Sequence, residues 1–390
     1  MIEPIYLDNA STTPLDPEVF DAMKPYFSTH FGNPSSIHSF GQFTKNALED
    51  SREKIAHLLN AKPSEIFFSS GGTESNNMAV KGFFFSNPKD SLTVLTSKLE
   101  HKAVLEPLAW LSNKFSVQVN YISHDETGKI ITTGIEDFSK GERLLVSIML
   151  VNNELGNINP IELISEKVKK LGGYFHTDAV QAIGKVPFSL KGSSISLATV
   201  TAHKFYGPKG IGALFIREGT PIDSLLHGGS HERNRRAGTE SAALAVGFAK
   251  ALEISIRDFE KNDRQIRHVS ALFLDSLSAS LKDSGITFSL NGNENEKIAH
   301  VLNLSFHLPT KKRLASDVFL LAMDAVGVAI SSGSACTSGT EKPSHVLLAL
   351  GKTEDEARLS ARISFSKFTT ERDVLFASEK IPEALKRISK

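Results

Sequence analysis

The chain has 390 residues, of which 40% are hydrophobic, and its 44 Lys and Arg balance 44 Asp and Glu. This length predicts two or three domains of ordinary size. The balanced charge argues against a protein that binds nucleic acid or an anionic membrane surface. A single cysteine, Cys336, excludes an intrachain disulfide and is typical of a reducing compartment.

The N-terminus and the hydropathy favour a cytoplasmic protein. The opening residues, MIEPIYLDNASTTP, have no basic stretch followed by an apolar one, unlike a signal peptide. No uninterrupted apolar run approaches the roughly 20 residues that span a bilayer. We therefore expect a cytoplasmic protein that does not associate with membranes.

Short apolar runs alternate with helical stretches over residues 64–217. The runs are IFFSS, LTVLTS, VQVNYIS, LLVSIML, YFHTD, ISLATVT and GALFIR, and residues 161–171 have the apolar period of a helix. Strands that alternate with helices favour a mostly parallel sheet covered on both faces. The last two runs are joined by a segment too short for a parallel crossover, so we predict that they pair antiparallel.

The pattern of predicted elements changes in the last third of the sequence. Residues 243–254 and 265–281 are predicted to form long helices that lead out of the first domain. After them come the short strand-like runs ITFSLNG, HVLNLSF and VGVAISSGSAC, and then helical stretches with residues 358–365 between them. This pattern indicates a second, smaller α+β domain.

A glycine-rich motif, SSGGTESNN at 69–77, follows the first strand and opens a helix. Its glycines permit a tight turn, and helix N-terminal N–H groups together with the Thr73 hydroxyl can bind a phosphate. An ordinary strand–helix turn with Ser or Thr as N-cap explains the same residues. The motif alone leaves both interpretations open.

A carboxylate stands at the end of the strand YFHTD. There Asp178 would point into the crevice where open α/β sheets bind ligands, and it can keep the ring nitrogen of a cofactor protonated. Gln181 follows three residues later and can donate to a ring oxygen. Alternatively, Asp178 only caps a helix that follows the strand.

Lys204 lies in the segment TAHKFYGPKG at 201–210. A lysine whose pKa is lowered by its neighbours can form a Schiff base, whereas a solvated lysine is an ordinary surface charge. Thr201 and His203 are candidate phosphate ligands beside it.

Two further residues are candidates for binding and attack. Cys336 lies among small residues in SSGSACTSGT at 331–340, which suits a nucleophile on a mobile loop; the alternative is a buried small hydrophobe. Arg362, in the alternating run ARISF, can bind a carboxylate through two parallel hydrogen bonds, or can be a surface arginine.

In this order, the motifs resemble the class V branch of the fold-type-I pyridoxal-phosphate enzymes, specifically the cysteine desulfurases of the nitrogen-fixation and iron–sulfur-assembly type. The resemblance runs over nearly the whole chain. Besides the motifs above, it includes YLDNASTTP (6–14), GNPSSIH (32–38), LEHKAV (99–104), VNNELG (151–156), HTDAVQAIGK (176–185), HGGSHERNRRAGTE (227–240) and ARISFSKFTTE (361–371).

The resemblance implies an α/β fold with two domains and a homodimer. The large, cofactor-binding domain, with a mostly parallel seven-stranded sheet, would cover residues 14–255. Residues 1–13 and 256–390 would form the smaller α+β domain, which carries the Cys336 loop and the arginine for the substrate carboxylate.

The resemblance also implies a role for each matching residue. Pyridoxal 5'-phosphate would be bound by Gly72, Thr73, His101, Asn153, Asp178, Gln181, Thr201, His203 and Lys204, with Thr239 contributed by the other subunit. His101 would stack on the ring and take part in proton transfer, and Lys204 would form the Schiff base. Asn153 and Arg362 would bind the L-cysteine carboxylate.

The implied reaction removes sulfur from L-cysteine, gives L-alanine and leaves a persulfide on Cys336. An iron–sulfur scaffold or another acceptor, such as a tRNA-thiolation protein, would receive the sulfur. No intrinsic metal is implied, and Cys336 would meet an iron–sulfur cluster only transiently, on a partner. Thr201 stands where the family usually has serine, Leu150 stands where histidine is common, and Ser230-His231 varies the glycine-rich stretch.

Three other functions remain open. A selenocysteine lyase or cysteine-sulfinate desulfinase shares the scaffold, but that group carries its cysteine in a shorter segment preceded by histidines. An aminotransferase of the serine–glyoxylate type needs no loop thiol. A non-catalytic scaffold for an iron–sulfur assembly partner has no need of Lys204, Asp178 and His101.

Overall fold

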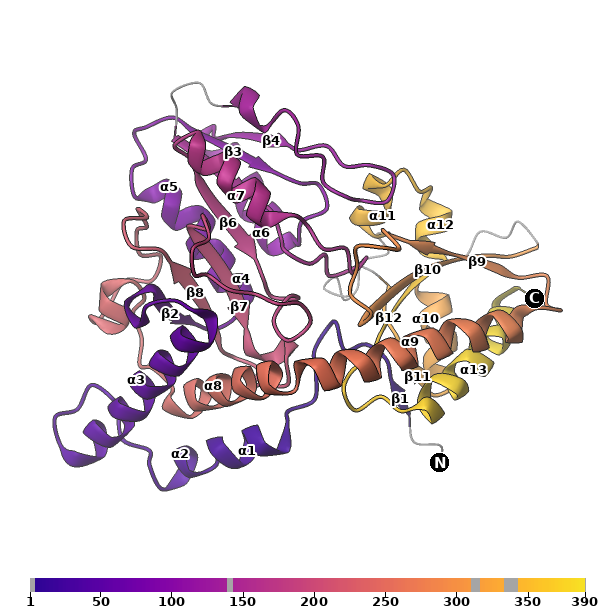
Figure 1. Cartoon of the computed structure of the whole chain (residues 1–390), viewed down its shortest axis with the longest axis horizontal. Helices are drawn as coiled ribbons and strands as arrows, with labels where there is room; N and C mark the ends of the chain where they lie inside the picture. Colours follow the sequence, from indigo (N-terminus) through magenta and orange to yellow (C-terminus); the bar gives the residue numbers. More distant parts are fainter. Residues whose placement is uncertain (1–3, 139–142, 310–315, 333–342, 390) are drawn as a thin grey trace.

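The computed structural model describes residues 4–138, 143–309, 316–332 and 343–389. A large sheet with its helices lies at one end of the molecule and a smaller sheet at the other (Figure 1). Two long helices, α8 (Ala242–Arg257) and α9 (Phe259–Leu281), run end to end from the first part to the second. The long helices predicted at 243–254 and 265–281 are therefore confirmed.

The large sheet has seven strands, as expected. In spatial order they are β2 (Ile66–Ser69), β8 (Gly212–Ile216), β7 (Leu197–Thr201), β6 (Tyr174–Asp178), β5 (Arg143–Ser147), β3 (Leu92–Thr96) and β4 (Gln118–Tyr121). Strand β8 runs antiparallel to both of its neighbours, and the other pairs are parallel. The short connection between β7 and β8 thus forms the predicted antiparallel pair.

Helices cover both faces of this sheet. They are α1 (Pro17–Met23), α2 (Pro25–Ser28), α3 (Ser39–Leu59), α4 (Gly72–Asn77), α5 (Phe83–Phe85), α6 (Lys102–Phe115) and α7 (Ile161–Lys170), and a π-helical turn, Met78–Gly82, joins α4 to α5. Successive side chains of a strand enter opposite cores, because Phe68 packs with α3 and α8 while Phe67 packs with α5 and α6. This two-sided burial explains why the strand sequences are continuously apolar.

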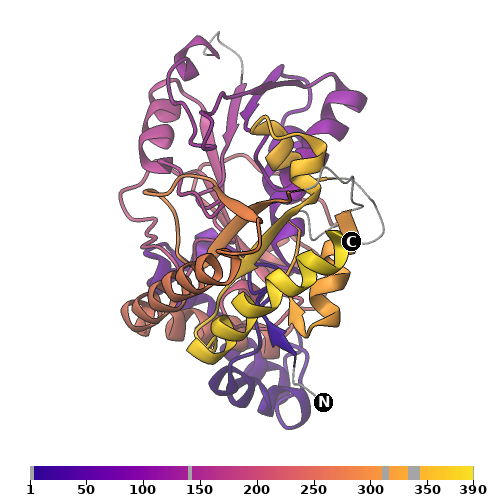
Figure 2. The same ribbon diagram turned by 90° about the vertical axis from the view of Figure 1, so that its right-hand side faces the viewer.

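The smaller part is built on three antiparallel strands. Strand β10 (Val301–His307) lies between β9 (Thr287–Asn291) and β12 (Ser360–Ser364), and the short strands β1 (Ile5–Tyr6) and β11 (Val328–Ala329) pair in parallel. Its helices are α10 (Ser316–Ala325), α11 (His345–Ala349), α12 (Glu354–Arg358) and α13 (Glu371–Ser389). Helices α9 and α13 lie side by side over the sheet (Figure 2).

The N-terminal segment belongs to the core of the smaller part. Leu7 is fully buried in the same hydrophobic cluster as Phe273 of α9 and Ile363 of β12. This cluster supports the expectation that residues 1–13 join the C-terminal domain, although the proposed division at 255/256 falls within helix α8 and stays a prediction. Within the described ranges, no helix is both long and apolar enough to cross a membrane.

The aromatic core of the smaller part gives a test of this packing. The Phe273 side chain is fully buried, and its ring centroid lies 5.8 Å from that of Phe365. We expect Phe273→Ala to lower the free energy of unfolding by about 3–5 kcal/mol, because it removes buried surface and leaves a cavity. Urea denaturation measures this loss.

The matched control is Phe273→Leu, which keeps most of the apolar volume and is expected to cost about 1.5 kcal/mol or less. Equal losses for the two variants would contradict tight packing around this ring.

Candidate active site

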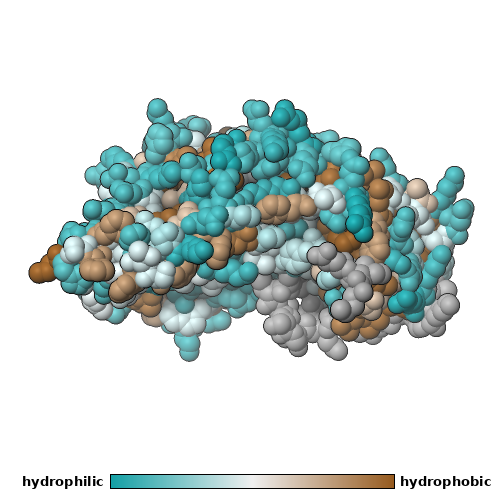
Figure 3. Space-filling model, turned by 90° about the horizontal axis from the view of Figure 1, so that it is seen from below, coloured by the Kyte–Doolittle hydropathy of each residue, from teal (hydrophilic) through white to brown (hydrophobic). Residues whose placement is uncertain are grey.

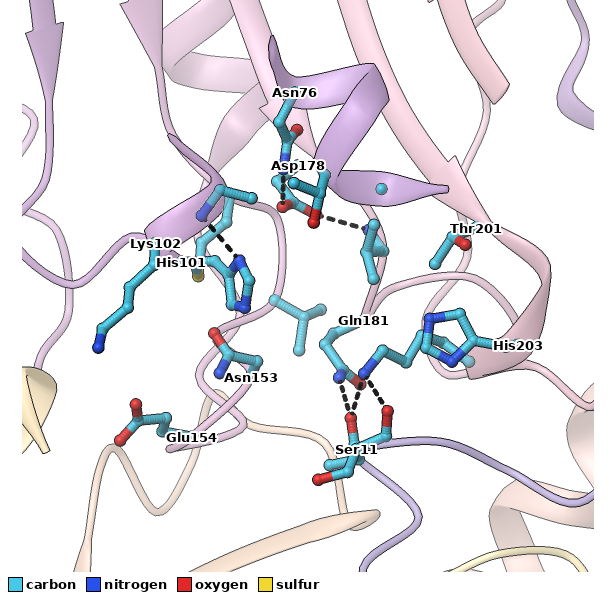
Figure 4. Close-up of a pocket in the computed structure, with 18 of the residues that line it drawn as sticks. Ser11, Asn76, His101, Lys102, Asn153, Glu154, Asp178, Gln181, Thr201 and His203 are labelled. Atoms are coloured by element: carbon cyan, nitrogen blue, oxygen red, sulfur yellow. Dashed lines mark hydrogen bonds between the residues drawn. The ribbon is translucent and has the colours of Figure 1, made fainter. Parts of the chain in front are cut away.

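One cavity of about 330 Å³ collects the predicted site residues from both parts of the chain. Its size lies at the lower end of the roughly 300–1,000 Å³ typical of small-molecule sites. The predicted residues that line it are Gly72, Thr73, His101, Asn153, Asp178, Gln181, Thr201, His203, Lys204 and Arg362. Figure 4 shows several of these side chains converging on this space from different strands and loops.

Asp178 is the last residue of β6 and is almost completely buried. Its Oδ2 accepts a hydrogen bond from Asn76 Nδ2 at 2.7 Å, and its Oδ1 accepts one from the Val180 N–H at 2.9 Å. The carboxylate is therefore held in one orientation at the edge of the sheet (Figure 4). The helix that the capping alternative placed after Asp178 is absent, because residues 180–185 form turns.

Lys204 ends a 3₁₀ turn, Ala202–Lys204, that directly follows β7. Its Nζ donates to the backbone carbonyls of Ala10 at 2.7 Å and Ser11 at 2.6 Å. The Ala10 carbonyl also accepts a hydrogen bond from Gln181 Nε2 at 2.7 Å. The amine thus lies in the cavity beside Gln181 and is not an ordinary surface charge.

His101 is the N-cap of α6, and its Nδ1 accepts the Ala103 N–H at 3.0 Å. Burial lowers the pKa of His101, the Asp178 charge opposes this, and the Lys204 charge adds to it. With Nδ1 used as an acceptor, a neutral imidazole carries its proton on Nε2. The ring can therefore donate a hydrogen bond through its Nε2–H.

The glycine-rich motif forms one end of the cavity. Helix α4 begins at Gly72 without a side-chain cap, and the N-cap position is occupied by Gly71 at φ 153°, which an L-residue rarely adopts. The simple interpretation, a Ser or Thr N-cap, is therefore wrong. The Thr73 side chain is exposed there and is available to an anion.

Thr201 and His203 lie at the same end with their own partners. The Thr201 hydroxyl donates to the Ile211 carbonyl at 3.0 Å, so its oxygen can only accept a further hydrogen bond in this arrangement. His203 Nδ1 lies 3.2 Å from Thr12 Oγ1. Burial lowers the pKa of His203 to about 4, with the Lys204 charge in the same direction, and the ring is neutral near pH 7.

Arg362 is buried on β12, which excludes the surface-arginine alternative. Its Nη1 donates to the Asn153 carbonyl at 3.0 Å, and its Nη2 donates to Asp8 Oδ1 at 3.0 Å and to Ser11 Oγ at 2.6 Å. Its Nε is buried and has no partner within the described ranges. The guanidinium is thus fixed at the cavity wall by the N-terminal segment.

The sequence analysis missed several residues of the cavity wall. Asn76, Lys102, Glu154 and His345 also line it. Glu154 is buried, accepts a hydrogen bond from Ser344 Oγ, and has its pKa raised by burial. Asn76 and Glu154 both stand within the quoted motifs, SSGGTESNN and VNNELG, and their place in these motifs is the signal by which they can be found.

One predicted residue that the structure describes, Thr239, is not brought into this cavity. Thr239 is exposed and lines a different, smaller cavity together with Ser69 and Arg236 of the same chain. Cys336 lies outside the residues that the structure describes. Within the described residues, no cluster of three or more His, Cys, Asp or Glu side chains is placed to hold a metal ion.

The donor set suits a flat heteroaromatic cofactor with a phosphate. A fixed carboxylate can hold a protonated ring nitrogen, and an amine and a histidine ring line the same cavity. The buried Oδ1 of Asn76 and Oγ1 of Thr177 near Asp178 have no described hydrogen-bond partner. These features fit pyridoxal phosphate, although each residue's role stays a prediction.

Comparisons with known proteins agree with this arrangement. The chain matches the family model of the class-V aminotransferases over residues 5–376. It is 42% identical over 388 residues to the cysteine desulfurase IscS of Dictyoglomus turgidum, a match that covers 99% of this chain and 96% of that protein. A solved NifS-like protein has a TM-score of 0.88 at 34% identity and covers 98% of this chain and 100% of its own. The structure of SspA in complex with cysteine has a TM-score of 0.78 at 33% identity and covers 94% and 100%, respectively.

The fold and the lysine, carboxylate and histidine of the cavity define an enzyme of the class-V aminotransferase family, whose members depend on pyridoxal phosphate. Within that family, the chain belongs to the cysteine desulfurases. The resemblance and the fold class predicted from the motifs are therefore confirmed.

The Asn76–Asp178 hydrogen bond can be tested by cofactor binding. Asn76→Ala removes a donor to a buried carboxylate, and hydrogen bonds to charged groups contribute about 1.5–3 kcal/mol. We expect the dissociation constant for pyridoxal phosphate to rise about 10- to 100-fold, as measured by absorbance titration of the apoprotein.

Asn113→Ala, on the exposed side of α6, is the matched control and should bind the cofactor like the unmodified protein. Unchanged binding by Asn76→Ala would mean that Asp178 needs no orienting partner.

Proposed function

We propose that this chain uses pyridoxal phosphate to remove sulfur from L-cysteine, giving L-alanine and a persulfide on Cys336. The observation that carries this proposal is the convergence of the Lys204 amine, the fixed Asp178 carboxylate and the buried Arg362 guanidinium on one cavity. An amine, a carboxylate and a guanidinium are the groups needed to hold the cofactor and an amino-acid carboxylate together.

When bound, pyridoxal phosphate supplies the electron sink for bond breaking at the substrate's Cα. Asp178 would bind the ring nitrogen, Gln181 and Asn153 the ring oxygen, and His101 the ring face. Gly72, Thr73, His203 and Thr201 would surround the phosphate, with Thr201 as an acceptor in its present rotamer. Lys204 would hold the cofactor covalently until the substrate displaces it.

The surroundings of Lys204 suit a residue that gains and loses a proton. Once released from the cofactor, the neutral Lys204 amine would be positioned in the cavity to act as the base for the Cα proton. The carbonyls of Ala10 and Ser11, at 2.7 Å and 2.6 Å, then stabilise the ammonium that forms. Arg362 and Asn153 hold the substrate carboxylate while this transfer takes place.

Sulfur transfer requires the Cys336 thiolate. A thiol with a pKa near 8.5 is only a few per cent ionised at neutral pH, and the attack forms an S–S bond while the substrate's Cβ–S bond breaks. The electron pair of that bond passes to the carbon skeleton, which takes up protons and leaves as alanine. With its proton on Nε2 and its Nδ1 occupied by the Ala103 N–H, neutral His101 would donate a hydrogen bond to the departing skeleton and not serve as the base for Cys336.

The direct test is an alanine and sulfide assay with purified protein, L-cysteine and a reductant. Cys336→Ala should abolish alanine release and keep the visible absorption of the bound cofactor, because it removes only the nucleophile. Lys204→Ala should remove that absorption band as well.

Alanine release at an undiminished rate from Cys336→Ala would refute the persulfide route. Transfer of the substrate's amino group to a keto acid would instead favour an aminotransferase.

We infer a homodimer from two features of the surface. Six large apolar side chains on and near α1, α2 and α3 are exposed: Phe20, Phe27, Phe31, Ile37, Phe40 and Phe43. Hydrophobic side chains are visible among the polar ones at the end of the molecule formed by these helices (Figure 3, left). Exposed apolar clusters of this kind are typical of association surfaces. Thr239, exposed and outside its own chain's cavity, would then complete the phosphate site of the partner.

Complementation tests this sharing of residues. Lys204→Ala and Thr239→Ala homodimers should each lose most activity, because every site lacks one residue. In a mixed dimer, the Lys204 of one protomer and the Thr239 of the other meet in one intact site. Co-expressed, differently tagged variants should therefore regain about half of the normal activity per heterodimer.

Failure of the heterodimer to regain activity would place Thr239 in its own protomer's site.

We propose that the sulfur acceptor is an iron–sulfur scaffold or another thiolation protein, and that the protein acts in the cytoplasm.

A further inference from the structure

Lys185, which the proposed reaction does not use, is hydrogen-bonded to a residue of the cavity. Its Nζ donates to Gln181 Oε1 at 2.5 Å, and the other end of the same amide, Nε2, donates to the Ala10 carbonyl at 2.7 Å. An ammonium group only donates and a carbonyl only accepts. The two contacts together therefore fix which end of the Gln181 amide faces Lys185 and which faces Ala10.

The turns after β6 bring Lys185 beside Gln181, which lines the cavity. Residues 180–185 form successive turns, in which Gly184 has a left-handed φ of 72° and the Lys185 N–H donates to the Ala182 carbonyl at 3.0 Å. The Lys185 side chain thereby meets that of Gln181, four residues earlier, as side chains at this spacing also do on a regular helix.

The amine of Lys185 is in an unfavourable place for a charge. Burial, together with the nearby charges of Lys204 and Arg362, lowers its pKa to about 7. Within the described residues, Gln181 Oε1 is the hydrogen-bond acceptor of this amine. A cation held near two other cations costs stability, and its contact with a cavity residue indicates a role in the site.

We propose that Lys185 is a positioning residue that keeps the Gln181 amide with its N–H groups toward the cavity and polarises them. This inference rests on the proposed function, in which Gln181 donates to the ring oxygen of the bound cofactor. A cation on the amide oxygen makes the amide N–H a stronger donor. A stronger donor stabilises negative charge on the ring oxygen and so weakens the hold of the cofactor–Lys204 linkage on its proton.

The absorption spectrum of the bound cofactor reports whether that linkage is protonated. It therefore gives a readout that is independent of activity. In Lys185→Met, we expect the midpoint of the spectral pH titration of the bound cofactor to rise by about 0.5–1 pH unit, the size of one ordinary hydrogen bond. The matched control is Lys191→Met, which removes an exposed lysine six positions further on and should leave the midpoint unchanged. Lys185→Arg keeps a cationic donor and should restore most of the original midpoint.

A double-mutant cycle separates positioning from a plain charge effect. In a Gln181→Leu background, Lys185→Met should cause no further shift, because its action passes through the amide. A full shift in that background, or no shift in the unmodified background, overturns the proposal. If Lys185→Met does not fold, as judged by thermal unfolding of the apoprotein, Lys185→Gln takes its place in the same cycle.

Failure of the positioning role of Lys185 can be distinguished from failure of the proposed function. If the unmodified protein acquires no visible band with pyridoxal phosphate, the proposed function fails. If the band forms and titrates identically with and without Lys185, only the positioning role fails.

Discussion

The contact of the Lys204 amine with the carbonyls of Ala10 and Ser11 joins the two parts of the molecule at the cavity. The segment 8–13 enters from the core of the smaller part and meets the edge of the large sheet. It also places Asp8 on Arg362 and Thr12 beside His203. The cavity therefore depends on one short segment of the smaller part that contacts residues of both parts. Neither part forms the cavity alone.

The charged side chains of the cavity and its neutral histidine rings occupy separate positions. Arg362 is paired with Asp8, and Asp178 is held by Asn76, whereas burial lowers the pKa of both His101 and His203. A site that must move protons at Cα gains from this separation of permanent charges and neutral donors.

Much of the fold followed from local patterns, and most of the site's contacts did not. The strands of the large sheet are continuous apolar runs, so period and length were enough to predict them. Asp178 was identifiable because it ends a strand, and Lys204 because it lies in a tight segment next to glycines. The contacts Asn76–Asp178, Asp8–Arg362 and Lys185–Gln181 were not predicted, since the first two join residues far apart in the chain. The third joins residues only four apart, but no pattern in the sequence indicated that the Lys185 amine would contact Gln181.

The same segment links substrate binding to the part of the chain that leads toward Cys336. Asp8 Oδ1 accepts hydrogen bonds from both Arg362 Nη2 and Ser331 Oγ, and the backbones of Ser331 and Arg362 are paired in both directions. If Arg362 binds the substrate carboxylate as proposed, that carboxylate would have to compete with Asp8 for the guanidinium. Because Asp8 is shared with Ser331, the proposed anchor for the substrate and the residue that leads toward the Cys336 segment form one hydrogen-bonded unit.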